Sequence, residues 1–152
     1  MTVTVRRADP LGPEARALLG ASAAMMADRY PAEVNYSMAP EDLDDPAIRF
    51  VLAFADDTAI GCAALATRAG YGEIKSMFVA PEARGLGAGA ALLRTLEGFA
   101  REDGLPALRL ETGPDLTSAC ALYEREGFAT RGPFGDYLDD PLSRFYEKPL
   151  GA

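Results

Sequence analysis

The segment Arg84–Ala90 alternates glycine with small or apolar residues, and it separates a strand-like run at residues 73–79 from a helix-like run that begins at residue 90. Small residues at the start of a helix leave several backbone N–H groups unpaired, and these donors act with the helix dipole to favour an anion. Arg84 adds a forked cation that suits a phosphate group. The segment therefore predicts a strand–loop–helix unit that binds a phosphorylated cofactor, most simply through its diphosphate.

Length and net charge limit the classes of protein to which this chain can belong. At 152 residues the chain is expected to form one domain over residues 1–152, with a core large enough to fold alone. A formal net charge of −8 argues against nucleic acid as a partner, because nucleic acid requires a cationic surface. No apolar run approaches the roughly 18 residues that cross a bilayer, and the N-terminus lacks the order of a signal peptide. We therefore expect no membrane association and a cytoplasmic location.

The sequence contains no histidine. This excludes Ser-His-Asp and Cys-His catalysis and most catalytic zinc sites. The two cysteines, Cys62 and Cys120, have apolar neighbours, which is typical of small core residues, and they are too few for a cysteine metal site. We expect no metal, and any acid–base chemistry must use carboxylates, tyrosine, lysine, cysteine or water.

Hydrophobic periodicity predicts the remaining elements. They are a strand at 2–6, a helix at 13–28, a hairpin of strands at 50–54 and 58–65, a helix from the glycine segment to about Asp103, a strand at 106–112, a helix at about 119–126 and two short final strands. Residues 30–46 are polar and interrupted by proline, so they predict a loop with at most a helical turn. One α+β domain with a mixed sheet and helices on both faces is the simplest account.

Two glycine patterns fit the segment, and they imply different cofactors. Gly85, Gly87 and Ala90 satisfy the loose dinucleotide fingerprint, and Glu111 ends the next strand-like run, where a ribose-binding acid is expected. Five residues, 80–84, separate the strand from the first glycine, whereas the fingerprint turn follows its strand directly. The chain also has one clear β-α-β unit, and the dinucleotide fold requires several. Both observations disfavour the dinucleotide interpretation.

The second pattern is Arg-x-x-Gly-x-Gly, formed by Arg84, Gly87 and Gly89. With the downstream segment Ala119–Phe128, it resembles the GCN5-related N-acetyltransferase (GNAT) superfamily, closely over residues 71–131. The resemblance implies a single domain of that fold, with a central mixed, mostly antiparallel sheet and helices on both faces. It also implies acetyl-CoA as the cofactor.

The resemblance assigns roles to particular residues. Backbone groups of Met77, Phe78 and Val79 are expected to pair with the pantetheine amides. N–H groups of the glycine segment are expected to hold the pyrophosphate: Arg84, Gly85, Leu86, Gly87, Ala88, Gly89 and Ala90. Tyr123 corresponds to the family's tyrosine that protonates the departing thiolate, and Glu73 to a carboxylate that some members use as a base. Many members carry asparagine seven positions before the tyrosine, where this chain has Leu116.

The alternatives to these side-chain roles are structural. Tyr123 has the helical spacing of a core residue, and Glu73 fits an ordinary solvated strand carboxylate. Two loops carry aromatic and acidic residues that fit either ordinary loop chemistry or a pocket for the acetyl acceptor, since loops on a rigid scaffold often carry specificity. The aromatic candidates for that pocket are Tyr30, Tyr36, Phe134 and Tyr137.

The sequence thus predicts an acetyl-CoA-dependent N-acetyltransferase that moves an acetyl group to a primary amine of a small molecule by direct attack. The alternatives are acetylation of a peptide or protein, and a non-catalytic sensor that binds acyl-CoA. A homodimer is left open.

Overall fold

The computed structural model describes residues 2–151. In chain order the elements are β1 (Val3–Arg7), α1 (Pro13–Arg29), the 3₁₀ turn η1 (Ala32–Val34), α2 (Pro40–Leu43), β2 (Ile48–Ala55), β3 (Thr58–Arg68), β4 (Tyr71–Val79), the 3₁₀ turn η2 (Pro81–Ala83), α3 (Ala88–Glu102), β5 (Ala107–Thr112), α4 (Thr117–Arg125), β6 (Ala129–Arg131) and β7 (Arg144–Pro149). The seven strands form one sheet in the order β1-β2-β3-β4-β5-β7-β6. Neighbouring strands are antiparallel except for β4 and β5, which are parallel. The expected α+β class with a mixed, mostly antiparallel sheet is confirmed.

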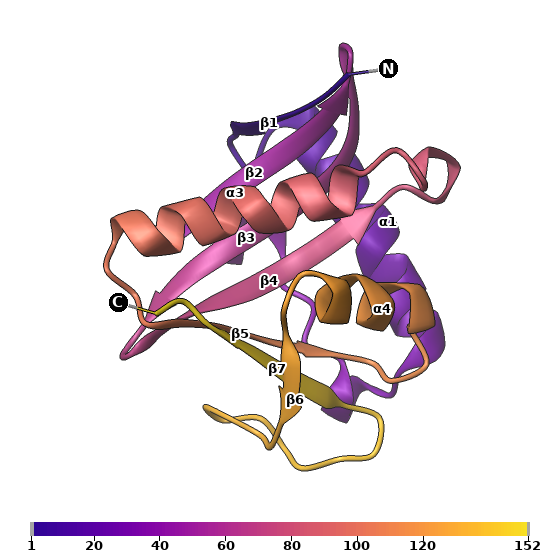
Figure 1. Cartoon of the computed structure of the whole chain (residues 1–152). Helices are drawn as coiled ribbons and strands as arrows, with labels where there is room; N and C mark the ends of the chain where they lie inside the picture. Colours follow the sequence, from indigo (N-terminus) through magenta and orange to yellow (C-terminus); the bar gives the residue numbers. More distant parts are fainter. Residues whose placement is uncertain (1, 152) are drawn as a thin grey trace.

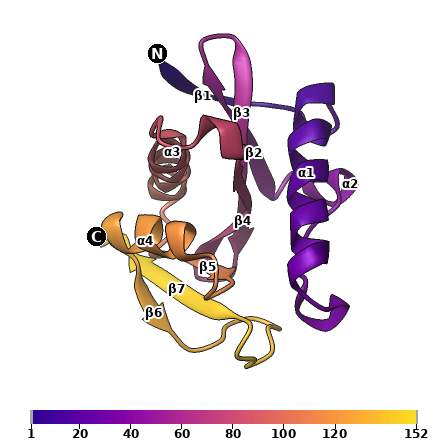
Figure 2. The ribbon, with the colours of Figure 1, turned by 90° about the vertical axis from the view of Figure 1, so that its right-hand side faces the viewer.

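Helices cover both faces of this sheet. Helix α1 lies on one face, and α3 and α4 lie on the opposite one (Figure 2). Because both faces are covered, the central strands are apolar runs rather than alternating patterns, and residues 50–55 of β2 and 60–66 of β3 are buried along their whole length. Among residues 2–151, no helix combines the length and apolarity that crossing a bilayer would require.

Helix α3 connects the two parallel strands and carries an amphipathic pattern. Its buried residues are Ala88, Leu92, Leu93, Leu96 and Ala100. They recur at helical spacing on one face, and this stripe packs against the sheet. The helix ends where Gly104 adopts φ 71° and the N–H of Leu105 donates to the carbonyl of Ala100 at 2.9 Å. Glycine accepts this left-handed conformation without steric cost, so the predicted helix end near Asp103 is confirmed.

The β4–α3–β5 crossover divides the sheet. Strands β1 to β4 lie on one side of it, and β5, β7 and β6 lie on the other (Figure 1). The loop that carries the glycine segment and the junction of β4 with β5 both belong to this crossover, so the fold brings the predicted phosphate site to the point where the two halves of the sheet meet.

Candidate active site

Strands β4 and β5 pair over only two positions and then diverge. The paired residues are Gly72 with Leu108 and Glu73 with Arg109, and the two strands separate towards their C-terminal ends (Figure 1). Beyond the second pair, the β5 side of β4 has no neighbouring strand in the register, so residues 74–79 present an open edge there. An open edge of this kind accepts an extended ligand that carries amide groups, in the manner of an added strand.

A β-bulge lies on this open stretch of β4. Cys62 of β3 pairs with Phe78 and Ala64 pairs with Lys75, so two residues of β4 oppose one residue of β3. Ser76, inside the bulge, has φ 55°, which is unusual for a residue other than glycine. Bulges redirect the backbone locally, and strained residues often mark functional sites. The bulge therefore makes the divergence of the two strands a candidate reaction centre.

The glycine segment forms the start of α3 as the sequence predicts. Gly85 and Gly87 have φ of 87° and 86°, conformations that strongly favour glycine. Gly87 is the N-cap residue, and no side chain caps the helix. The N–H groups of the first turn, which includes Gly89, therefore point outward without intrahelical acceptors. A Cβ on Gly89 would come within 2.6 Å of Leu122, so a side chain there would collide with α4.

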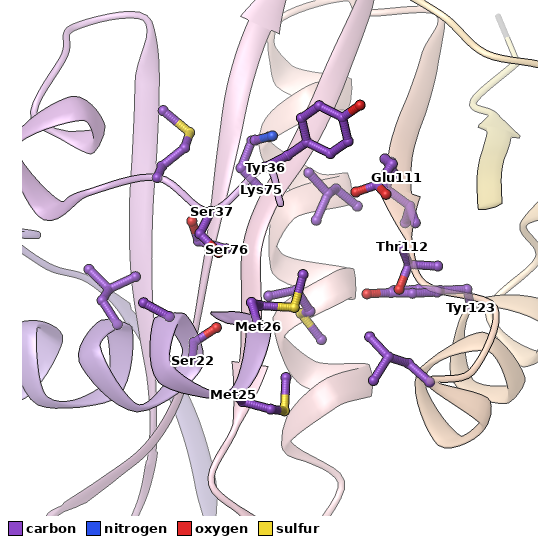
Figure 3. A pocket seen from close by; sticks show the side chains of 17 residues that line it. Ser22, Met25, Met26, Tyr36, Ser37, Lys75, Ser76, Glu111, Thr112 and Tyr123 are labelled. Carbon is purple, nitrogen blue, oxygen red and sulfur yellow. The ribbon is translucent and has the colours of Figure 1, made fainter. Parts of the chain in front are cut away.

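A cavity of about 110 Å³ lies at the divergence of the strands, between α1, β4, β5 and α4 (Figure 3). The residues that line it are Leu19, Ser22, Ala23, Met25, Met26, Tyr36, Ser37, Met38, Ile74, Lys75, Ser76, Met77, Leu110, Glu111, Thr112, Leu116 and Tyr123. Most of this wall is apolar. Its ionisable side chains are Lys75 on β4, Glu111 on β5 and two tyrosines, so the chemistry of the cavity depends on these groups.

Tyr123 lies on α4 with its hydroxyl directed into the cavity (Figure 3). Its side chain is 5% exposed and packs against the rings of Phe128 and Tyr146 at centroid distances of 6.0 and 5.8 Å. Burial raises the pKa of its phenol above the ordinary value, and the charges of Cys120 and Glu111 act in the same direction. Tyr123 therefore carries its proton and is rigidly held, although the same shift makes its phenol a weaker acid.

Glu111 is the carboxylate that lines the cavity. Burial raises the pKa of its carboxyl above the ordinary value. The Ser143 hydroxyl, which donates to it at 2.7 Å, and the charge of Lys75 partly oppose this shift, and the charge of Glu73 adds to it. A carboxylate with a raised pKa in a cleft is a candidate proton acceptor. Its position near the C-terminal end of a parallel strand is where ligand sites gather in such sheets, a signal that the sequence already contained.

Glu73, the base suggested by the family resemblance, is not among the residues that line the cavity. Its carboxylate accepts hydrogen bonds from Arg68 Nε at 3.1 Å and from the Tyr137 hydroxyl, and Lys75 Nζ lies 3.7 Å away. Both of its oxygens are thus engaged within the protein. In this environment Glu73 positions Lys75 and Tyr137, whereas a general base requires an oxygen that can reach the substrate.

The four aromatic candidates for the acceptor pocket separate into two groups. Tyr36 lines the cavity. Tyr30 instead donates to Asp115 at 2.5 Å, which ties the end of α1 to the loop before α4. Phe134 and Tyr137 pack against each other behind Lys75, with centroids 5.1 Å apart. These three aromatics are absent from the cavity lining.

Leu116, where many family members have asparagine, contributes an apolar surface to the cavity. The neighbouring Thr117 and Ser118 are exposed and do not line it. A hydrophobic side chain therefore lines the cavity at the position where many family members carry an amide. Among residues 2–151, no cluster of three or more acidic, histidine or cysteine side chains has the geometry to hold a metal ion.

Comparisons with known proteins agree with this architecture. The model of the Acetyltransferase (GNAT) family matches residues 18–128, and the chain belongs to this family. A relative from Azospirillum brasilense, described as an IAA acetyltransferase, is 47% identical over 150 residues, which cover 97% of this chain and 98% of the relative. The chain is an acetyltransferase of the GNAT type, and the recognition made from its motifs is confirmed.

Solved structures extend the likeness to the whole fold. A structure from Klebsiella pneumoniae is 34% identical, covers 98% of both chains and superimposes with a TM-score of 0.82. The PaiA N-acetyltransferase of Thermoplasma acidophilum, solved in complex with coenzyme A, has a TM-score of 0.75 at 21% identity and covers 98% of this chain and 99% of its own. At that identity the second likeness concerns the fold alone.

Proposed function

We propose that this protein transfers the acetyl group of acetyl-CoA to a primary amine of a small molecule, by direct attack of the amine. The proposal rests on three features together: a helix start without a side-chain cap, an open strand edge and a cavity lined by Glu111 and Tyr123. The Thermoplasma structure, whose fold is the same, contains coenzyme A, and the Azospirillum relative is described as an acetyltransferase.

The cofactor is expected to lie along these features in order. The N–H groups of Arg84–Ala90 are suited to the pyrophosphate, because the first turn of α3 has no side-chain cap. The open edge of β4 at Met77, Phe78 and Val79 is suited to the pantetheine amides. When bound, acetyl-CoA supplies an acetyl group activated as a thioester. The protein's own contribution is then to orient the amine and to move two protons.

Glu111 and Tyr123 are proposed for these two protons. Only the neutral form of the amine has the lone pair that attacks, and Glu111 accepts the proton that its nitrogen loses as it bonds to the acetyl carbon. As the carbon–sulfur bond breaks, Tyr123 donates its hydroxyl proton to the departing thiolate. The raised pKa of Glu111 brings its basicity closer to that of the amine. We place Glu111 in the role that the resemblance suggested for Glu73, since Glu111 lines the cavity.

Cofactor binding and turnover are tested together. Acetyl-CoA at about 100 times its Kd is expected to raise the melting temperature by about 5 to 10 °C, because a ligand that binds only the folded state stabilises it. NAD and NADP serve as the control and are expected to leave it unchanged. A panel of small primary amines is then screened for release of free CoA thiol. Stabilisation by acetyl-CoA without release by any amine would contradict the enzyme and favour the sensor.

The phosphate site is tested by Arg84→Ala. Arg84 is exposed beside the glycine loop, and loss of one cation–phosphate contact is expected to raise the Kd for CoA about 10-fold. Arg16→Ala is the matched control, since Arg16 is an exposed arginine that pairs with Glu41 at 2.8 Å on α2. Its Kd for CoA is expected to equal that of the wild type, as measured by isothermal titration calorimetry. Equal affinity in both variants would remove Arg84 from the cofactor site.

A further inference from the structure

The cavity has a second polar wall that the proton transfers leave unused. Lys75 and Tyr36 both line the cavity (Figure 3). Both also contact Tyr137. We propose that this wall binds a carboxylate of the acetyl acceptor, so that the acceptor is an α-amino acid or a closely related amino-carboxylate. The inference rests on the proposed function and names the substrate class of the same site.

The charge around Lys75 favours an anion. Glu73 is paired with two cations, Arg68 at 3.1 Å and Lys75 at 3.7 Å, so this group of three carries two positive charges and one negative charge, a net +1. The third carboxylate nearby, Glu111, offsets this charge while it is ionised, and it no longer does so once it has accepted the proton of the amine. Lys75 is only 13% exposed, so a carboxylate that enters the cavity meets a cation that water screens little.

Lys75 also has hydrogen-bonding capacity that the protein does not use. An ammonium group has three donors. One donates to the Tyr137 hydroxyl at 2.7 Å, and Glu73 lies at ion-pair distance. Burial lowers the pKa of Lys75, which shows that its charge is poorly solvated, although Glu73 partly opposes the shift. A bound carboxylate would supply the missing acceptor and restore solvation to the ammonium.

Tyr36 supplies an independent observation. Its hydroxyl is the one buried side-chain polar atom without a hydrogen-bond partner within the part of the chain that the structure describes. Its ring packs edge-on against Tyr137, with centroids 4.7 Å apart and an interplanar angle of 84°, so the hydroxyl is held in place. A buried hydroxyl without a partner is unfavourable, and native proteins rarely keep one. A carboxylate oxygen in the cavity would accept its proton.

The rest of the cavity fits the other parts of an amino acid. Glu111 and Tyr123 lie on β5 and α4, on the opposite side from α1, and are suited to the amine (Figure 3). Met25, Met26 and Met38 offer a flexible apolar surface for a side chain. An amino acid thus places its amine near the acid–base pair and its carboxylate near Lys75.

The inference is tested by comparing matched substrates. L-Methionine, L-leucine, L-phenylalanine and L-tryptophan are each compared with their carboxamides and with the amines formed by removing the carboxylate. We expect the best amino acid to exceed its carboxamide and its amine by about 10- to 100-fold in kcat/KM, the range for loss of a hydrogen bond to a charged group. Equal rates for amino acids and amines would overturn the carboxylate site and leave acetyl transfer intact.

Variants locate the effect in the protein. In Lys75→Met the ratio of kcat/KM for the amino acid to kcat/KM for the amine is expected to fall close to one. Lys75→Arg is expected to retain part of this preference, and Tyr36→Phe is expected to lower the ratio several-fold. Lys148→Met is the matched control, because Lys148 is also part-buried and ion-paired, with Glu97 at 2.6 Å, and does not line the cavity. An undiminished ratio in Lys75→Met would overturn the proposal.

A binding measurement separates this inference from the proposed function. The melting temperature of the CoA-saturated protein is recorded with N-acetyl-L-amino acids and with the corresponding N-acetyl amides. Greater stabilisation by the N-acetyl amino acids than by their amides, if it is lost in Lys75→Met, supports the carboxylate site. If no amine releases CoA at the same time, the proposed enzyme activity is overturned and the carboxylate site is not. If both series stabilise the protein equally and amines are acetylated, the carboxylate site is overturned and the enzyme activity is not.

Discussion

Tyr123→Phe is expected to lower kcat by about 100-fold or more and to leave the Kd for CoA unchanged, since general acid catalysis typically contributes about 10²- to 10⁴-fold. The substitution removes one hydroxyl that points into the cavity and keeps the ring that packs against Phe128 and Tyr146. Steady-state kinetics with saturating acetyl-CoA measure the first quantity, and calorimetric titration with CoA measures the second.

Tyr71→Phe is the matched control for this substitution. Tyr71 is on β4, where its ring lies under the Arg109 guanidinium at 4.4 Å, and it does not line the cavity. Its loss of a hydroxyl is expected to leave kcat and the Kd for CoA at wild-type values. Equal turnover by Tyr123→Phe and the wild type would remove Tyr123 as the acid and leave it the core-packing role that its helical spacing also allows.

Glu111→Gln is expected to lower kcat/KM by about 100-fold at neutral pH, because the amide cannot accept the proton of the amine. The wild-type rate should rise with pH as Glu111 loses its proton, over a range displaced upward by its raised pKa. The variant should lack this part of the profile and keep the rise caused by ionisation of the amine substrate. Kinetics over a pH series, with the same amine for both proteins, measure the difference.

Protein stability supplies the folding control for Glu111→Gln. Because burial raises the pKa of Glu111, the folded chain binds this proton more tightly than the unfolded chain does. The stabilisation is complete below the unfolded pKa and declines as the pH rises through the higher folded pKa. Glutamine removes that decline, so the variant is expected to melt no lower than the wild type at neutral pH. Full activity in Glu111→Gln, and its loss in Glu73→Gln, would return the role of base to Glu73.

The helix start at Gly87 illustrates what local sequence predicts well. A positive φ at Gly85 and Gly87, the absence of a side-chain cap and the helical spacing of α3 are all encoded within one contiguous segment. The same holds for the β2–β3 hairpin, whose turn at residues 56–57 separates two apolar runs. These features need no distant partner. The family was recognised from the glycine segment together with the downstream segment Ala119–Phe128.

The two carboxylates on the parallel strands illustrate what local sequence cannot predict. Glu73 and Glu111 each lie on a strand of the same crossover, and either fits the composition of an active site. Which of them reaches the cavity depends on where β4 and β5 cease to pair and on the side chains that engage Glu73 from Arg68 and Tyr137. Tyr137 is 64 residues away in the chain, so no local pattern predicts this contact.

The polar wall formed by Lys75 and Tyr36 also depends on contacts between segments that are far apart in the chain. Tyr36 lies in a loop with no regular pattern, and its neighbour Tyr137 comes from another loop near the C-terminus. The amino-acid sequence by itself determined the helix start at Gly87 and the family, because consecutive residues specify the backbone conformation of the first and short motifs identify the second. Only the tertiary structure decided which acid, which lysine and which tyrosines line the cavity, because that choice depends on strand divergence and on packing between segments far apart in the chain.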